Sequence, residues 1–338
     1  MDFTKITKIS RFRDPFQDFI EVEKISEVRT DPLTGHQARI LDFPIKVLEK
    51  IDLNPIIEKS KGICPFCPEI VEKVTPKFSS HLVSRDRYSR GEALCVPNAF
   101  PYDENSAVTV MTAQHYVGLT EFTHTILEDA FLCSIDYLND LADTQKDAVY
   151  QSINWNYFPL AGGSVIHPHL QIIASSTPTS YFTSVIASVE KYMREKKRDL
   201  WEDFLDTELS LKERFISRSG GIFWSVAFAP MGAFDIVGIM ENVHRPSDIR
   251  GETMDSLITG ILDILRFIDS LNMYSFNMSI YFFTNNSLFL PHIRICPRLS
   301  LPPLDTCEIN YMRMLHNETL TTLKPEDICS RIGSFWET

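Results

Sequence analysis

A weak internal duplication constrains the fold of this 338-residue chain more than any other feature. Each half holds an apolar run, a Phe and a Pro, a second apolar run and a His. The two sets are 93–96, Phe100, Pro101, 107–111 and His115, and then 222–226, Phe228, Pro230, 236–240 and His244. The interval from the proline to the histidine is 14 residues in both halves. The chain is therefore expected to be built from two similar units.

The agreement between the halves continues downstream. Each histidine is followed by a stretch of helical periodicity, and then by a β-like segment that ends in Pro168-His169 or Pro291-His292. Each half thus predicts two strands, a helix and a strand pair, which is an α+β unit with an antiparallel sheet. We expect two fused units, residues 1–178 and 179–338. Accidental agreement between two halves of an α+β chain is the alternative interpretation.

Charge, hydropathy and cysteine content exclude several classes of protein. The net charge of −12 argues against a general nucleic-acid binder, whereas a small anionic ligand remains compatible with a few local arginines or helix N-termini. The sequence contains no run of about 18 apolar residues, so no membrane span is predicted. Residues 1–16 do not resemble a secretion signal. The seven cysteines are an odd number and mostly lie apart, unlike a disulfide framework. These features predict a cytoplasmic protein.

The sharpest local motif is His167-Pro168-His169-Leu170-Gln171. Histidines two residues apart on an extended segment point to the same face, and so does Gln171. Gly162, Gly163 and Ser164 precede the motif; small residues let the backbone approach a phosphate and offer N–H donors. Neutral imidazole is a good nucleophile, so catalysis is one interpretation. A metal site or a structural pair is the other.

A second motif is Cys64-Pro65-Phe66-Cys67. Two thiolates at this spacing can hold one zinc ion, but a structural site needs four ligands. No second pair of this kind exists, so histidines would have to complete the site, and His115 and His167 are available. A redox dithiol and a bare pair of buried thiols are the alternatives.

Together these residues resemble the galactose-1-phosphate uridylyltransferase family, the transferase branch of the histidine-triad superfamily. The match runs from about residue 63 to 175 and rests on several separated elements in the family's order: Cys64, Cys67, Asn98, Phe100, Pro101, His115, Asn156, Ser164, His167, His169 and Gln171. The resemblance implies histidine-triad-like units, nucleotidyl transfer, a structural zinc ion and a homodimer with sites near the interface. Its substrates would be a nucleotide-sugar, or another nucleoside diphosphate, and a phosphate-bearing acceptor.

Roles for single residues also follow from the resemblance. Cys64, Cys67, His115 and His167 would be the zinc ligands, and His169 the nucleophile that carries the nucleotide. Gln171 and Ser164 would steady the transferred phosphoryl group. The substrate site would be lined by Asn98, Phe100, Asn156, Gly162 and Gly163, and Arg39 would reach a phosphate. A solvated surface arginine is the alternative for Arg39.

Departures from the family pattern leave the substrate open. Leu170 stands where the uridylyltransferases usually have Gly, and Leu290-Pro291-His292 keeps one histidine of a second metal pair, so a second metal is doubtful. Relatives of this branch transfer the nucleotide to inorganic phosphate, as ADP-sugar or dinucleoside-polyphosphate phosphorylases. A nucleotide hydrolase and a non-catalytic, zinc-stabilised nucleotide sensor are further alternatives.

Overall fold

A ten-stranded antiparallel sheet organises the computed structural model, which describes residues 1–42, 48–301 and 306–336. The first half of the chain supplies β4 (Tyr88–Arg90), β5 (Ala93–Pro97), β6 (Asn105–Val110), α3 (His124–Thr144), β7 (Tyr150–Tyr157) and β8 (His169–Ser175). The second half supplies β9 (Phe215–Ser219), β10 (Ile222–Val226), β11 (Ile236–Met240), α6 (Glu252–Ser270), β12 (Phe276–Phe283) and β13 (His292–Pro297). The predicted α+β class is confirmed.

The strand order β4-β5-β6-β8-β7-β12-β13-β11-β10-β9 reads the same way from either edge when the two halves are equated. Even single hydrogen bonds recur, because Met111 N donates to Pro168 O at 3.0 Å and Met240 N to Pro291 O at 2.9 Å. β7 and β12 pair at the centre and join both halves into one sheet. The duplicated layout is present, whereas the division of the chain after residue 178 stays a prediction.

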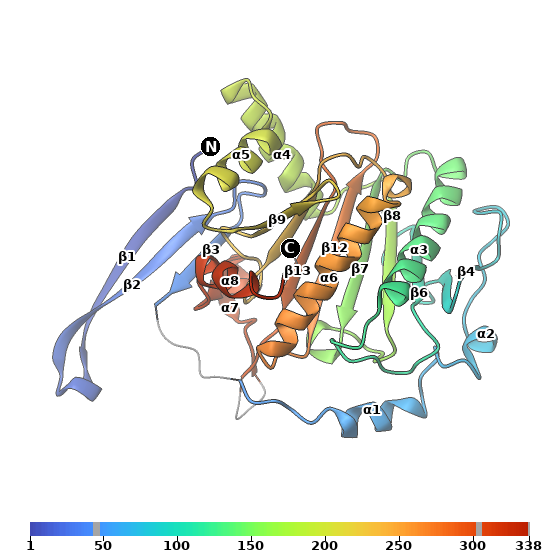
Figure 1. The fold of residues 1–338 in the computed structure, drawn as a ribbon, viewed down its shortest axis with the longest axis horizontal. Coiled ribbons are helices and arrows are strands. Elements are labelled where there is room, and N and C mark those ends of the chain that lie inside the picture. Colours follow the sequence, from blue (N-terminus) through green and yellow to red (C-terminus); the bar gives the residue numbers. More distant parts are fainter. Residues whose placement is uncertain (43–47, 302–305, 337–338) are drawn as a thin grey trace.

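The helices α3 and α6 cover one face of this sheet (Figure 1). Their apolar sides pack on the inward residues of β7 and β8, among them Trp155, Leu170 and Ile172, which are all buried. The Thr123 hydroxyl caps α3 by accepting from Ile126 N. Because side chains alternate along a strand, His169 and Gln171 must face the opposite side of the sheet.

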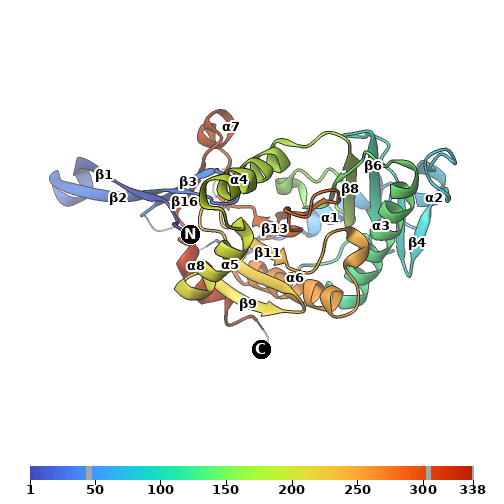
Figure 2. The same ribbon diagram turned by 90° about the horizontal axis from the view of Figure 1, so that it is seen from above.

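Helices α4 (Ser180–Lys196) and α5 (Leu200–Leu211) form a separate apolar cluster with the β10, β11 and β12 side chains of that opposite face. Figure 2 shows α4 on the other side of the sheet from α6. The smaller elements are η1 (Pro15–Gln17), α1 (Asn54–Lys61), α2 (Val71–Val74), η2 (Pro159–Ala161), η3 (Pro246–Asp248), β14 (Ser300–Leu301), β15 (Thr306–Cys307), α7 (Tyr311–His316) and α8 (Pro325–Ile332). Among the described residues, no helix combines the length and apolarity needed to cross a bilayer.

A second sheet of four strands flanks the body, in the order β1 (Lys5–Asp14), β2 (Ile20–Thr30), β3 (Gln37–Leu41) and β16 (Thr319–Thr321). β1 and β2 pair along their whole length and project from the body as a hairpin arm (Figure 1). Apolar side chains on this arm face solvent, including Phe16 at 95% and Phe19 at 65% exposure.

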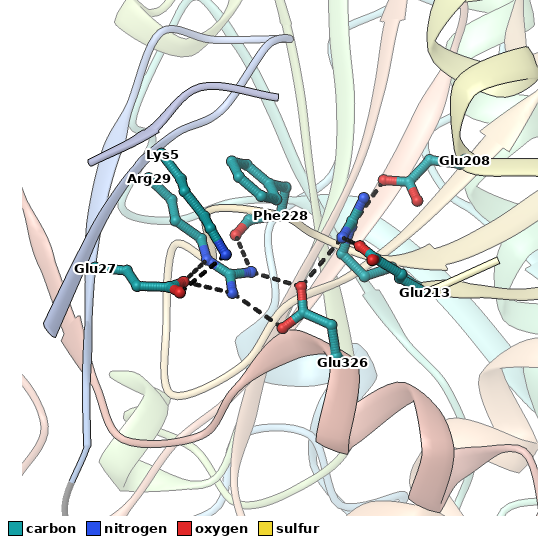
Figure 3. Close-up of polar contacts among 8 residues, drawn as sticks. Lys5, Glu27, Arg29, Glu208, Glu213, Phe228 and Glu326 are labelled. Atoms are coloured by element: carbon teal, nitrogen blue, oxygen red, sulfur yellow. Dashed lines mark hydrogen bonds and ion pairs between the residues drawn. The ribbon is translucent and has the colours of Figure 1, made fainter. Parts of the chain in front are cut away.

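Buried arginines fasten the flanking sheet to the body (Figure 3). Arg29 of β2 donates to both carboxylate oxygens of Glu326 on α8, at 2.7 and 3.0 Å. The fully buried Arg214 donates to the same carboxylate at 3.1 Å and to Glu208 of α5 at 3.0 Å. One glutamate therefore joins β2, α8 and the segment between α5 and β9.

Candidate functional site

Four side chains that the sequence names as metal ligands meet at one point. The ligand atoms of Cys64, Cys67, His115 and His167 all lie within 4.8 Å of one another. Cys64 Sγ lies 3.6 Å from His167 Nδ1, and Cys67 Sγ lies 3.4 Å from His115 Nδ1. Bond lengths of about 2.0 to 2.3 Å put tetrahedral ligands roughly 3.3 to 3.8 Å apart, so the group can hold a metal ion.

Hydrogen bonds orient both imidazoles toward this point. His167 Nε2 lies 2.7 Å from the carbonyl oxygen of Thr112, which only accepts, so the hydrogen sits on Nε2 and leaves Nδ1 with its lone pair. His115 Nε2 lies 2.8 Å from Ser60 Oγ, which donates its own hydrogen to Ile57 O. Nδ1 of His115 is therefore also free to bind a metal. Such partners fix the tautomer and the angle of a ligating histidine.

Burial sets the protonation of the group. It lowers the pKa of His167 to about 4 and also lowers that of His115, so both imidazoles are neutral at pH 7. Burial and the neighbouring Cys64 raise the pKa of Cys67 to about 11, so this thiol keeps its proton until a cation displaces it. Two neutral imidazoles beside two thiols favour metal binding over the redox dithiol interpretation.

His169 begins β8 and turns to the open face of the sheet. Its Nδ1–H donates to the carbonyl oxygen of His167 at 2.8 Å, which leaves Nε2 with the lone pair. The side chain is only 5% exposed, and burial lowers its pKa. The Phe66 ring, between the two cysteines, lies 5.2 Å from the imidazole between centroids. His169 is thus a fixed, neutral imidazole whose Nε2 contacts no polar group of the described residues.

The loop before the His-Pro-His motif is tightly folded. Phe158 is buried with a φ of 72°, a conformation that costs a non-glycine residue about 1–3 kcal/mol. The N–H groups of Gly162 and Gly163 donate within the loop, to Pro159 O and Phe158 O. The sequence predicts that these two N–H groups are available to a phosphate, but here they are already engaged. The Ser164 N–H, in contrast, has no protein acceptor among the described residues. A Cβ on Gly163 would lie 2.9 Å from Asn156 O, so this position requires glycine.

The structure brings some of the other predicted residues near His169 and leaves others apart. Gln171 faces the same side of β8 as His169, half-exposed, and Ser164 is exposed. Asn156, on the neighbouring strand, accepts from Asn277 Nδ2 at 2.7 Å. Asn98 shapes the β5–β6 turn by accepting from Phe100 N. That turn lies beyond the Ala174 end of β8, because Asn105 pairs with Ala174 and Val110 with His169.

Phe100 and Arg39 lie farthest from the expected arrangement. Phe100 is 82% exposed at the tip of its turn. Arg39 lies in the flanking sheet, and Figures 1 and 2 place β3 well away from β8. Its guanidinium pairs with Glu318 at 2.6 Å. The roles proposed for both residues stay predictions.

The second half carries a counterpart of this site that is closed. His292 repeats the His169 contact, since its Nδ1–H donates to Leu290 O at 2.8 Å. Its Nε2 accepts from the Tyr181 hydroxyl at 2.7 Å, and it is fully buried. Arg294, the counterpart of Gln171, pairs with Asp31 and Asp235. The structure uses these residues to hold α4 and the β2–β3 turn.

Sequence reasoning missed the residues that support the metal group, namely Ser60 and the carbonyl of Thr112. Phe66 was visible inside the Cys-x-x-Cys motif, but its contact with His169 depends on the fold. Ser60 carries no motif signal, and a backbone carbonyl has none in any sequence. Leu170, which departs from the family pattern, lies in the helix-covered core on the side away from His169.

Comparison with known proteins places the chain. No family model matches it. It is 30% identical over 315 residues to an uncharacterised protein of Archaeoglobus fulgidus, a match that covers 93% of each chain. This chain belongs to the family of that archaeal protein. Among solved structures, a GalT-like protein of Arabidopsis thaliana has a TM-score of 0.68 at 18% identity, covering 90% of this chain and 98% of its own.

Two further solved structures share the fold. An ADP-glucose phosphorylase of Arabidopsis thaliana with bound ADP-glucose has a TM-score of 0.69 at 16% identity, and a uridylyltransferase has 0.65 at 17%. Each match covers 91% of this chain and 98% of the other. The chain therefore shares the fold of these three proteins, as the resemblance seen in the sequence predicts.

Proposed function

We propose that this protein is a nucleotidyltransferase that works through a nucleotidyl group on His169. The observation that carries the proposal is the state of this imidazole: it is neutral, held by the His167 carbonyl, and its Nε2 lone pair has no hydrogen-bond partner among the described residues. The fold shared with an ADP-glucose phosphorylase and a uridylyltransferase supports it.

The reaction consists of two similar displacements. In the first, His169 Nε2 attacks the α-phosphorus of a nucleoside diphosphate donor; an N–P bond forms, and the P–O bond to the leaving phosphate breaks with its electron pair on that oxygen. In the second, a phosphate oxygen of the acceptor attacks the same phosphorus and the N–P bond breaks. Its electron pair returns to Nε2.

This chain's own groups would assist both steps. Hydrogen bonds from the Ser164 N–H and the Gln171 amide would stabilise charge on the transferred phosphoryl group. The His167 carbonyl keeps the hydrogen on Nδ1 of His169, so the imidazole stabilises positive charge when Nε2 is bonded to phosphorus. The tight loop around Gly163 holds these donors in place without reorganisation.

We further propose that Cys64, Cys67, His115 and His167 hold zinc, since two thiols and two imidazoles are a donor set that suits this ion. Bound there, zinc would fix the start of β8, which carries His169, relative to Cys64 and Cys67, a structural role. The same four ligands do not by their chemistry exclude iron, so the metal content of the purified protein decides between the two.

The acceptor separates two versions of the function. Transfer to a hexose phosphate would make the protein a uridylyltransferase-like enzyme, and transfer to inorganic phosphate a phosphorylase. We also propose a homodimer, supported by the apolar side chains that the hairpin arm exposes.

Intact-protein mass after brief incubation with UDP-glucose, ADP-glucose, GDP-sugars and diadenosine polyphosphates tests the proposal. A gain of one nucleoside monophosphate, absent in His169→Asn, is expected and identifies the base. Subsequent loss of the adduct on adding hexose phosphate or inorganic phosphate identifies the acceptor. A folded, metal-loaded protein that gains no mass with any donor would contradict the transferase function and leave the nucleotide sensor as the alternative.

A further inference from the structure

A cavity of about 240 Å³ lies on the open face of the sheet, two strands from β8. Its floor is formed by Asn277 and Ser279 of β12 and by Arg294 of β13, and its other wall by Glu308 and Arg313. None of these residues belongs to the cluster that binds the metal or to the glycine-rich loop.

The strand register relates the cavity to the proposed site. Gln171 pairs with Asn154, Asn154 with Ser279, and Ser279 with Arg294, so these residues form one row across four strands. Neighbouring strands lie about 4.8 Å apart, which separates β8 from β12 by roughly 10 Å. The cavity is therefore too far from His169 to hold the reacting phosphoryl group itself. It lies at a distance that another group of the same substrate can reach.

Hydrogen bonds connect the cavity to the loop that precedes His169. Asn277 Nδ2 donates to Asn156 Oδ1 at 2.7 Å and to the carbonyl oxygen of Ala161 at 2.8 Å, next to Gly162. Asn277 Oδ1 in turn accepts from Arg298 Nη1 at 3.2 Å. The amide and hydroxyl groups of the floor are thereby already engaged, which leaves the charged groups of the wall to select a ligand.

Several charged groups gather at the cavity, and one guanidinium among them has no carboxylate partner in the described part of the chain. Three guanidinium groups line it against one carboxylate. Asp31 and Asp235 neutralise Arg294, and Glu308 neutralises Arg298. Arg313 contacts only the amide oxygen of Asn317, at 3.2 Å, and has no carboxylate partner among the described residues.

The imidazole of His36 does not balance the positive charge of Arg313. Burial, and after it the positive charge of Arg313, lower the pKa of His36 to about 4, so that this imidazole is neutral at pH 7. Arg313 thus lines this small cavity with a guanidinium that no carboxylate of the described residues pairs with. A guanidinium fork matches the geometry of a phosphate group.

We propose that this cavity binds a phosphate group of the acceptor that is remote from the phosphorus reacting at His169, with Arg313 as its cation. The inference rests on the proposed function and makes it more specific. The substrate class is a sugar phosphate with a second phosphate group, carried at the far end from the one that takes part in transfer.

Calorimetric binding of glucose 1,6-bisphosphate, glucose 1-phosphate and inorganic phosphate to the full chain tests the inference. Arg313→Gln is expected to weaken bisphosphate binding about tenfold or more, and glucose 1-phosphate binding much less. Arg313→Lys keeps the charge and should lose less. Arg331→Gln, an exposed arginine on α8 outside the cavity, is the matched control and should change nothing.

The outcomes separate this inference from the proposed function, because binding in a His169→Asn background needs no covalent adduct. If binding depends on Arg313 while the parent chain gains no nucleotidyl adduct from any donor, the phosphate subsite is retained and the transferase function is contradicted. Equal dependence for glucose 1-phosphate would identify the reacting phosphate as the occupant and overturn the bisphosphate assignment. Unchanged affinity for all three ligands in Arg313→Gln, with the fold verified by thermal unfolding, would overturn the subsite itself.

Discussion

At the scale of single residues, the two histidines of the His-Pro-His motif carry their hydrogen on different ring nitrogens. Thr112 O accepts from Nε2 of His167, so Nδ1 faces the thiols, whereas His167 O accepts from Nδ1 of His169, so Nε2 faces the open side of the sheet. Two backbone carbonyls thus select the tautomer of each ring. A sequence shows the residue types but not this choice, which depends on where the chain places its carbonyl groups.

Ser60 is expected to support metal binding without contacting the metal. Ser60→Ala removes the acceptor that holds Nε2–H of His115, and loss of such a partner typically lowers metal affinity about 10–100-fold. Competition with a chromophoric chelator measures the affinity directly, independently of activity. Ser184→Ala, which removes an exposed hydroxyl on α4, is the control and should leave the affinity unchanged. An unchanged affinity in Ser60→Ala would show that the hydrogen bond has no such role.

Gly163 is expected to be indispensable to the loop beside His169. In Gly163→Ala the new methyl group would meet Asn156 O at 2.9 Å and Phe158 O at 3.1 Å, and both are backbone atoms that cannot rotate away. We expect a loss of about 1–3 kcal/mol in unfolding free energy and slower adduct formation. Urea unfolding and adduct mass are the measurements. Gly62→Ala, at a position with nothing within 4 Å, should remain within about 0.5 kcal/mol of the parent chain.

At the scale of elements, the repeated pattern predicts strand, strand, helix and strand pair in each half, and the structure confirms this order. The Cys and His motifs likewise predict four side chains that meet. The hairpin arm, the closing of the His292 site by Tyr181 and the cavity beside Arg313 were not predicted. The last two depend on contacts between residues far apart in the chain, such as Tyr181 with His292, which no local periodicity encodes.

The buried ion pair between α5 and the segment before β9 is expected to make stability depend on pH. Burial outweighs Arg214 and raises the pKa of Glu208 to about 7, above the 4.5 of an unperturbed glutamate. The folded state therefore favours protonated Glu208, and its stability falls as pH rises from about 4.5 through 7. Arg214→Met removes the counter-charge, so this variant should lose about 3–5 kcal/mol of unfolding free energy relative to the parent chain at pH 8, and less at pH 5.

Urea unfolding at both pH values measures this deficit. Replacing both partners, as in Arg214→Met with Glu208→Leu, removes both charges of this pair and should recover much of the lost stability. Glu213→Gln, which alters the exposed partner of the same arginine, is the milder control. An equal deficit at both pH values, or a double variant no more stable than Arg214→Met, would argue that Glu208 is not the group that titrates.

At the scale of the whole molecule, the hairpin arm exposes apolar side chains that packing against the body does not cover. β1 and β2 of the flanking sheet project from the body and expose Phe12, Phe16, Phe19 and Ile20 near their tip, at 43 to 95% of their surface. Apolar side chains gathered at the end of a projecting arm mark an interaction site. A second copy of this chain is the partner that we propose, because the sequence resemblance implies a homodimer.

Charges at the tip of the arm should therefore disrupt the homodimer. Parent protein is expected to elute, in size exclusion with light scattering, at twice the 38.8 kDa of one chain, and Phe16→Glu with Phe19→Glu at the mass of one chain. The tip makes few contacts with the body, so unfolding free energy at equal chain concentration should fall only by the share that dimerisation adds. Thr7→Glu with Ser10→Glu adds the same charge at exposed polar positions of β1 away from the tip and should remain dimeric. A parent protein that is monomeric at all concentrations would contradict the homodimer, and a tip variant that stays dimeric would place the interface elsewhere.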